Sequence, residues 1–225
     1  MFGRSERQRR SQEQALYWSG MKKDRLAALL FFGALGASAA LAKERASPRT
    51  NLVLARAGNV EIVLAEGEYI ARNSEDFNCW PSYYGQFIAR VSLNGRTVES
   101  SLGERGVCAG PWSLRLQDYN HDGQPDFNIG IQENRANSFY ELFTIGRDGK
   151  VRTLNVRHDD GSVDDSVTAE TTGNSTTFDV TASGFRAKSR DNPPDPDVAY
   201  WMTLYEWKDG MFHERATIPA ARSKK

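Results

Sequence analysis

Residues 86–102 read QFIARVSLNGRTVESSL, and this stretch sets the architecture that we expect for the chain. Two runs rich in β-branched and apolar residues flank the dipeptide Asn94-Gly95. Asn and Gly both tolerate the positive φ angles of a tight two-residue turn, so this arrangement is the strongest short-range signal for a β-hairpin. The stretch therefore predicts two antiparallel strands joined by that turn.

The same signal recurs along the chain. Strand-like runs flank four further turn signals, which are Ala57-Gly58-Asn59, Asp148-Gly149, Gly173-Asn174 and Asp209-Gly210. No amphipathic helix of ten residues and no clear internal repeat follows residue 43. Strands at about ten-residue spacing predict an all-β fold with little helix, an antiparallel sandwich or a barrel-like sheet of hairpins. The run at residues 199–208 is apolar on both faces, which predicts a central strand, and the irregular, Pro-rich segment 186–198 predicts a surface loop.

The N-terminal residues predict export. From Met21 a short basic start precedes an apolar run at residues 26–36, and small residues then end in Ala40-Leu41-Ala42. This order is typical of a secretory signal peptide at residues 21–42, cleaved after Ala42 or after Ala39. Residues 1–20 are then an over-extended start, and residues 43–225 are a single β domain. The alternative is an uncleaved membrane anchor, although the apolar stretch is at the short limit for spanning a bilayer.

Charge argues against nucleic-acid binding. The whole chain has 29 basic and 29 acidic residues. Residues 1–42 contain seven of the basic and three of the acidic residues, so residues 43–225 have 22 basic and 26 acidic residues and a net charge of −4. Such a chain has no general attraction for phosphate backbones. With the signal removed, we expect a periplasmic or secreted protein with no membrane span.

Two cysteines, Cys79 and Cys108, lie in the part expected to be exported. An even count in an oxidising compartment predicts one disulfide, and closing this loop would stabilise the fold by about 3–4 kcal/mol in the chain-entropy model. The alternative is a pair of buried thiols.

Residues 118–126, DYNHDGQPD, place oxygen-bearing side chains at alternate positions. Calcium prefers six to eight hard oxygens, and carboxylates, amides and backbone carbonyls supply them. The spacing predicts one calcium ion held by the five residues Asp118, Asn120, Asp122, Gln124 (through its carbonyl) and Asp126. An EF-hand is excluded because Ile129 replaces the required Glu, and strand-like runs flank the loop. The alternative is a polar turn without metal.

The loop and its flanks, SLRLQDYNHDGQPDFNIGI at residues 113–131, resemble the D-x-N-x-D-G-x-x-D calcium loops of FG-GAP and VCBS-type repeats, which lie between two β-strands. A single such loop in a small exported chain is also similar to the periplasmic immunity proteins that neutralise secreted peptidoglycan hydrolases, and to lysozyme inhibitors of comparable design. This resemblance implies a calcium-binding inhibitor of a cell-envelope hydrolase.

Aromatic side chains offer a second kind of candidate site. The segment FNCWPSYYGQF contains Trp80, Tyr83 and Tyr84, and Trp201 lies in the last predicted hairpin. Such residues anchor protein partners or stack on sugar rings, but they also line cores. Of the three histidines, His121 should point out of the calcium loop, and His158 begins an acidic segment that predicts a solvated turn.

Motifs for catalysis are missing from the sequence. It contains no nucleophile elbow, zinc H-E-x-x-H, P-loop or Gly-rich dinucleotide turn, so we expect a binding protein and not an enzyme. The leading hypothesis is a protein that binds and inhibits a peptidoglycan hydrolase. A cell-wall glycan-binding module and a calcium-dependent hydrolase are the alternatives.

Overall fold

The computed structural model describes residues 47–70, 82–109, 112–133, 137–170, 173–190 and 198–221. These residues form β-strands and turns without a helix, which confirms the predicted all-β class. A helix of the length and apolarity needed to cross a membrane is accordingly not found in this part of the chain. Residues 1–20, the predicted signal at 21–42 and residues 191–197 of the predicted Pro-rich loop lie outside it.

The first sheet is an antiparallel meander in which each strand pairs with the next along the chain. Its hairpins include the one predicted from Asn94-Gly95, whose φ angles of 51° and 75° are those of a tight positive-φ turn. Its strands are β1 (Ser47–Ala57), β2 (Val60–Ile70), β3 (Ser82–Leu93) and β4 (Arg96–Cys108).

The second sheet is centred on β6. One edge of β6 pairs with β5, and the other pairs with β10 in its first half and with β7 in its second half. The strands are β5 (Asp126–Glu133), β6 (Asn137–Ile145), β7 (Val151–Thr153) and β10 (Ser166–Glu170). As predicted, Asp148-Gly149 lies in the turn between β6 and β7.

The third sheet has the order β11-β12-β13-β14-β8-β9 in the described residues. Asp209-Gly210 forms the turn between β13 and β14, and β13 is a central strand, as predicted. The contact between β14 and β8 is parallel, whereas the others are antiparallel. The strands are β8 (Val156–Arg157), β9 (Val163–Asp164), β11 (Asp179–Thr181), β12 (Gly184–Ser189), β13 (Val198–Lys208) and β14 (Met211–Ala221).

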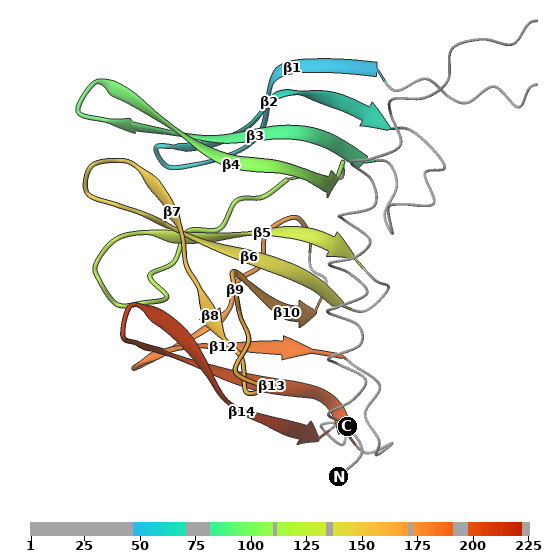
Figure 1. Cartoon of the computed structure of the whole chain (residues 1–225), viewed down its shortest axis with the longest axis vertical. Coiled ribbons are helices and arrows are strands. Elements are labelled where there is room, and N and C mark those ends of the chain that lie inside the picture. Colours follow the sequence, from blue (N-terminus) through green and yellow to red (C-terminus); the bar gives the residue numbers. More distant parts are fainter. Residues whose placement is uncertain are drawn as a thin grey trace, which may run out of the picture. The chain divides into compact units, whose positions relative to one another are not determined.

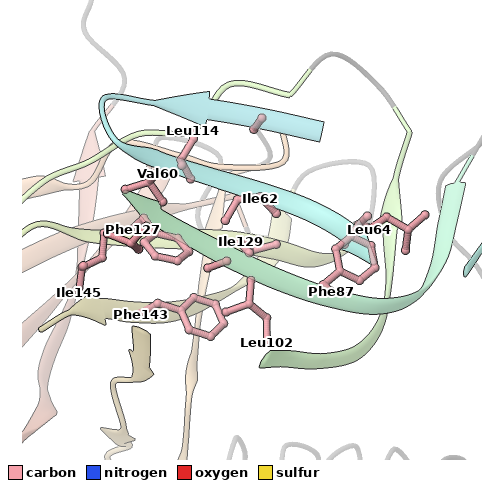
Figure 2. Close-up of a cluster of buried hydrophobic side chains, with 14 residues drawn as sticks. Val60, Ile62, Leu64, Phe87, Leu102, Leu114, Phe127, Ile129, Phe143 and Ile145 are labelled. Atoms are coloured by element: carbon pink, nitrogen blue, oxygen red, sulfur yellow. The ribbon is translucent and has the colours of Figure 1, made fainter. Parts of the chain in front are cut away.

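The sheets pack face to face, with the β5–β6 sheet in the middle (Figure 1). Alternation along β6 explains this position: Phe143 and Ile145 enter the core shared with the first sheet, while Tyr140 and Leu142 enter the core shared with the third. Figure 2 shows the first of these cores, where side chains of β2 and β3 meet Phe127, Ile129 and Phe143. The fold is therefore a sandwich and not a closed barrel.

Three local predictions are wrong. Residues 186–189 of the predicted Pro-rich loop 186–198 are not irregular, because they belong to β12 and pair with β13. The runs on either side of Gly173-Asn174 do not pair with each other, because β10 pairs with β6 and β11 pairs with β12. The run before the calcium loop is not a strand either. In residues 113–117 only Gln117 forms a bridge, with Asp126, because the Arg115 amide donates to the Ser175 hydroxyl instead of a ladder carbonyl.

Two glycines mark the closest approach within the first sheet. Gly67 of β2 faces Gly85 of β3, and a Cβ atom built on Gly85 would lie 2.2 Å from the carbonyl oxygen of Glu66. A Cβ on Gly67 would lie 2.3 Å from the carbonyl oxygen of Tyr84. Only glycine lets the two backbones approach this closely.

Candidate functional site

The predicted calcium loop connects the extended segment 112–117 to β5. Its ends meet at Gln117 and Asp126, whose backbones exchange two hydrogen bonds. Between them the chain turns through two left-handed residues, His121 with φ 59° and Gly123 with φ 75°. Residues 121–123 are the exposed tip, whereas Tyr119, Asn120 and Asp126 are buried.

Asp118 and Asn120 turn their side chains onto the amides of the loop. The Asp118 carboxylate accepts hydrogen bonds from the backbone N–H groups of Asp122 (3.2 Å) and Gly123 (3.1 Å). The Asn120 amide oxygen accepts from the same Asp122 N–H at 3.1 Å. Both side chains therefore accept hydrogen bonds from the backbone of the loop, and their role as ion ligands stays a prediction.

Asp122 and Gln124 continue this pattern at the tip. One Asp122 oxygen accepts from the Gln124 N–H at 2.7 Å, and the other accepts from the Asn120 side-chain amide at 3.3 Å. The Gln124 side chain donates to the carbonyl of Gly123 at 3.0 Å, so it points away from the neighbouring carboxylates. The predicted role of the Gln124 backbone carbonyl as an ion ligand stays a prediction.

Asp126 is the unusual member of the loop because its side chain is completely buried. Its Oδ2 atom accepts from the N–H groups of Tyr119 (2.7 Å) and Asn120 (3.3 Å), but Oδ1 has no hydrogen-bond partner. The Thr144 hydroxyl, at the paired position of β6, lies close enough to lower the pKa of Asp126 more than either backbone N–H group does, but it does not complete a hydrogen bond with Oδ1. Burial dominates and raises the pKa of Asp126 to about 7.

The oxygen atoms of the loop are of the kind that calcium binds, although the side chains that carry them do not converge on one point. Among the described residues, no three carboxylate, imidazole or thiol groups gather closely enough to hold a metal ion. The reason within the loop is that Asp118 and Asp122 direct their oxygens to backbone N–H groups. Even so, nine residues provide three carboxylates and one amide oxygen, and the unpartnered Asp126 Oδ1 is the kind of buried oxygen that a cation would satisfy.

Two side-chain amides, which sequence reasoning missed, fix the base of the loop to a distant segment. Gln117 accepts from the Phe178 N–H and donates to its carbonyl, both at 3.1 Å. Asn128 does the same with Thr176, at 2.8 Å in each direction, and also donates to the Tyr119 hydroxyl. For Asn128, the sequence carried one signal: an amide side chain lies between Phe127 and Ile129 in the apolar run that forms β5.

Tyr119 anchors the loop from within the second core. Its ring centroid lies 5.4 Å from that of Phe178 and 5.3 Å from that of Phe185, and burial raises the pKa of its hydroxyl. The loop is thus attached to the sandwich by a buried aromatic side chain and by a buried carboxylate.

The aromatic candidates are spread over different sheets. Tyr83 and Tyr84 are half-buried on β3, where Tyr83 packs against the first core and its ring lies 5.4 Å from that of Tyr69. Trp201 is half-buried on β13 of the third sheet. Trp80 lies outside the described residues. These three described side chains therefore do not form one patch, and their role in partner binding stays a prediction.

The predicted disulfide has one end in the described part of the chain. Cys108 ends β4, and no cysteine in this part is a free thiol. Cys79 lies outside it, so the pairing stays a prediction.

Two charged clusters lie outside the loop. Arg105 of β4 forms an ion pair with Glu141 of β6, and burial raises the pKa of Glu141 and also that of nearby Asp165. In the acidic turn, the His158 ring lies between Glu214 (2.9 Å) and Asp164 (3.1 Å). His158 is half-buried, with its side chain 20% exposed, whereas residues 159–164 are exposed, so the predicted solvated turn is confirmed for the residues that follow His158.

No protein-family model, curated protein or solved structure matches this chain. Any function has to be argued from the geometry of the loop and its surroundings.

Proposed function

We propose that this chain is an exported β protein that binds one calcium ion in the loop of residues 118–126. The observation that carries the proposal is the buried Asp126 carboxylate, whose Oδ1 atom has no hydrogen-bond partner. A buried carboxylate without full compensation is costly, and a bound cation removes that cost. Asp118, Asn120, Asp122 and Asp126 would hold the ion together with the backbone carbonyl of Gln124.

The ion's contribution is structural. When bound, calcium supplies the positive charge that lets three neighbouring carboxylates approach one another, and it replaces the hydrogen bonds of 3.1–3.2 Å that Asp118 and Asn120 now accept from loop amides. The loop base needs no ion, because Gln117 and Asn128 clamp it to residues 176–178. Calcium would therefore order mainly the exposed tip.

The ordered tip is proposed to contact a peptidoglycan hydrolase and to inhibit it by blocking its cleft. Support comes from the resemblance of residues 113–131 to calcium loops of periplasmic immunity proteins, from the signal-like residues 21–42 and from the lack of catalytic motifs in the sequence. The exposed residues His121, Asp122 and Gly123 are the part of the loop that a partner can reach.

Calcium binding is tested first, by titration calorimetry on the purified protein. The variant is Asp122→Ala, and its matched control is Asp159→Ala, which removes an exposed carboxylate from the acidic turn. We expect Asp122→Ala to weaken calcium binding at least tenfold and the control to bind like the wild type. Equal calcium affinity in both variants would contradict the proposed site.

The partner is tested by capture from cell-envelope extracts with the tagged protein, in calcium and in chelator, followed by mass spectrometry. Retention of a peptidoglycan hydrolase in calcium, and inhibition of that enzyme in a wall-turbidity assay, would support the proposal. Capture of wall fragments without a protein would favour a glycan-binding module. Turnover of wall material by the chain alone would identify a hydrolase.

A further inference from the structure

The tip of the calcium loop contacts the third sheet through one side chain. His121 occupies the left-handed region between the predicted ligands Asn120 and Asp122, and its ring contacts the end of β11. The ring atom Nε2 lies 2.6 Å from the carbonyl oxygen of Thr181. Because a carbonyl oxygen can only accept, His121 is the donor in this contact.

Thr181 ends the short edge strand β11 and begins the turn to β12. With Ala182 and Ser183 it forms one wall of an open, mainly apolar hollow of about 390 Å³ on the third sheet. The other lining residues are Arg186, Met202, Leu204, Ala216 and Ile218. Ile218 is 56% exposed, so this apolar surface is open to solvent. The position of the β11–β12 turn therefore affects the shape of the hollow.

The contacts made by the loop base and the loop tip differ in kind. Gln117 and Asn128 hold residues 176–178 through paired hydrogen bonds from buried or half-buried side chains, and none of these involves a predicted calcium ligand. Thr181, three residues further along, is held by His121, which lies between two predicted ligands. The tip thus contacts Thr181 directly, a residue that also pairs with Gly184 of β12, whereas Phe178 is bonded to the loop base.

We propose that His121 couples occupancy of the calcium loop to the β11–β12 turn, and thereby to the apolar hollow. The proposal rests on the proposed calcium site. Calcium draws its oxygen ligands to about 2.3–2.6 Å, whereas Asp118 and Asp122 now direct theirs to the amides of residues 122–124. Re-forming the tip around an ion reorients residue 121, and its hydrogen bond transmits this change to Thr181.

The test combines two measurements on the intact protein with calcium and with chelator. Hydrogen exchange reports the amides of residues 181–184, and methyl NMR reports Met202 and Ile218 in the hollow. The variant is His121→Ala. The matched control is His213→Ala, since His213 also contacts a backbone carbonyl near a turn, that of Lys208, but lies away from the loop.

In the wild type and in His213→Ala we expect calcium to slow exchange at residues 181–184 at least threefold and to shift both methyl signals. In His121→Ala, calorimetry should give a calcium affinity within about threefold of the wild type, while the turn and the methyl groups no longer respond. A full response in His121→Ala, or none in the wild type despite calcium binding, would overturn the coupling alone. Absence of calcium binding to the wild type would instead overturn the proposed function and the coupling with it.

Discussion

Arg105 and Glu141 join two layers of the sandwich by an ion pair between β4 of the first sheet and β6 of the middle sheet. Both side chains are largely buried, at 10% and 15% exposed, and the guanidinium also lies over the Phe143 ring, 5.5 Å from its centroid. Arg105 Nε has no hydrogen-bond partner, so the pair does not satisfy every polar atom that it buries.

We expect Arg105→Met to lower the free energy of unfolding by about 3 kcal/mol, because it leaves the Glu141 carboxylate buried without its counter-charge. The double variant Arg105→Met with Glu141→Leu should recover most of this loss, since two apolar side chains replace both charges. Urea unfolding of the two single variants and the double variant measures the coupling. This account would be contradicted if the double variant lost as much free energy of unfolding as the two single variants together.

Asp126→Asn should separate metal binding from stability. The amide keeps an acceptor for the Tyr119 and Asn120 N–H groups but removes a buried charge whose Oδ1 has no partner. In chelator, we expect the variant to be more stable than the wild type by about 1–3 kcal/mol. It should also lose the stabilisation that calcium gives the wild type, as measured by thermal unfolding with and without the ion. A variant less stable than the wild type in chelator would show that the charge is well compensated.

His158 should make stability depend on pH above neutrality. Burial alone would lower its pKa, but the hydrogen bonds and charges of Asp164 and Glu214 outweigh burial and raise the pKa to about 10, from 6.5 in the unfolded chain. The folded state therefore binds this proton more tightly than the unfolded state. The stabilisation is complete below pH 6.5 and is lost as pH rises to about 10.

The expected loss over this range is about 2 kcal/mol, reduced from the full shift because Asp164 is half exposed. Urea midpoints measured between pH 6 and pH 10 test it, with His158→Gln as the comparison. The variant should be less stable at pH 6 and should show a flatter profile. Parallel profiles for the two proteins would mean that other groups cause the dependence.

The Gly67–Gly85 contact predicts a steric effect. Gly85→Ala places a Cβ against the Glu66 carbonyl, so we expect it to lower the free energy of unfolding by more than about 3 kcal/mol. Gly95→Ala is the control, because Gly95 has φ 75° but nothing within 4 Å of an added Cβ. It should cost about 1 kcal/mol from backbone strain alone. Similar losses in the two variants would remove the clash as the cause.

The features that could be predicted from the sequence are those with local causes. Asn94-Gly95 and Asp209-Gly210 specify their hairpins through the φ angles that these residues accept, and the central position of β13 follows from apolar residues on both of its faces. The spacing of Asp118, Asn120 and Asp122 places them in one turn, where their side chains accept hydrogen bonds from loop amides, and their convergence on an ion stays a prediction.

The features that were missed depend on contacts between distant residues. Gln117 meets Phe178 across 61 residues, and Asn128 meets Thr176 across 48. The parallel pairing of β8 with β14 and the pairing of β10 with β6 are also non-local. Nothing in a strand of two to five residues specifies its partner, because such short segments pair wherever the surrounding layers leave an open edge.

The two faces of β6 also bear on how the chain acquires its structure. The first sheet is complete at residue 108, but its apolar face has no cover until β5 and β6 are in place, and β6 in turn needs β12–β14, near the end of the chain. Chains dominated by contacts of long sequence separation fold slowly and expose apolar intermediates. We therefore expect refolding over milliseconds to seconds through an intermediate that binds hydrophobic dyes, and a need for chaperones that keep the chain soluble until β14 has docked.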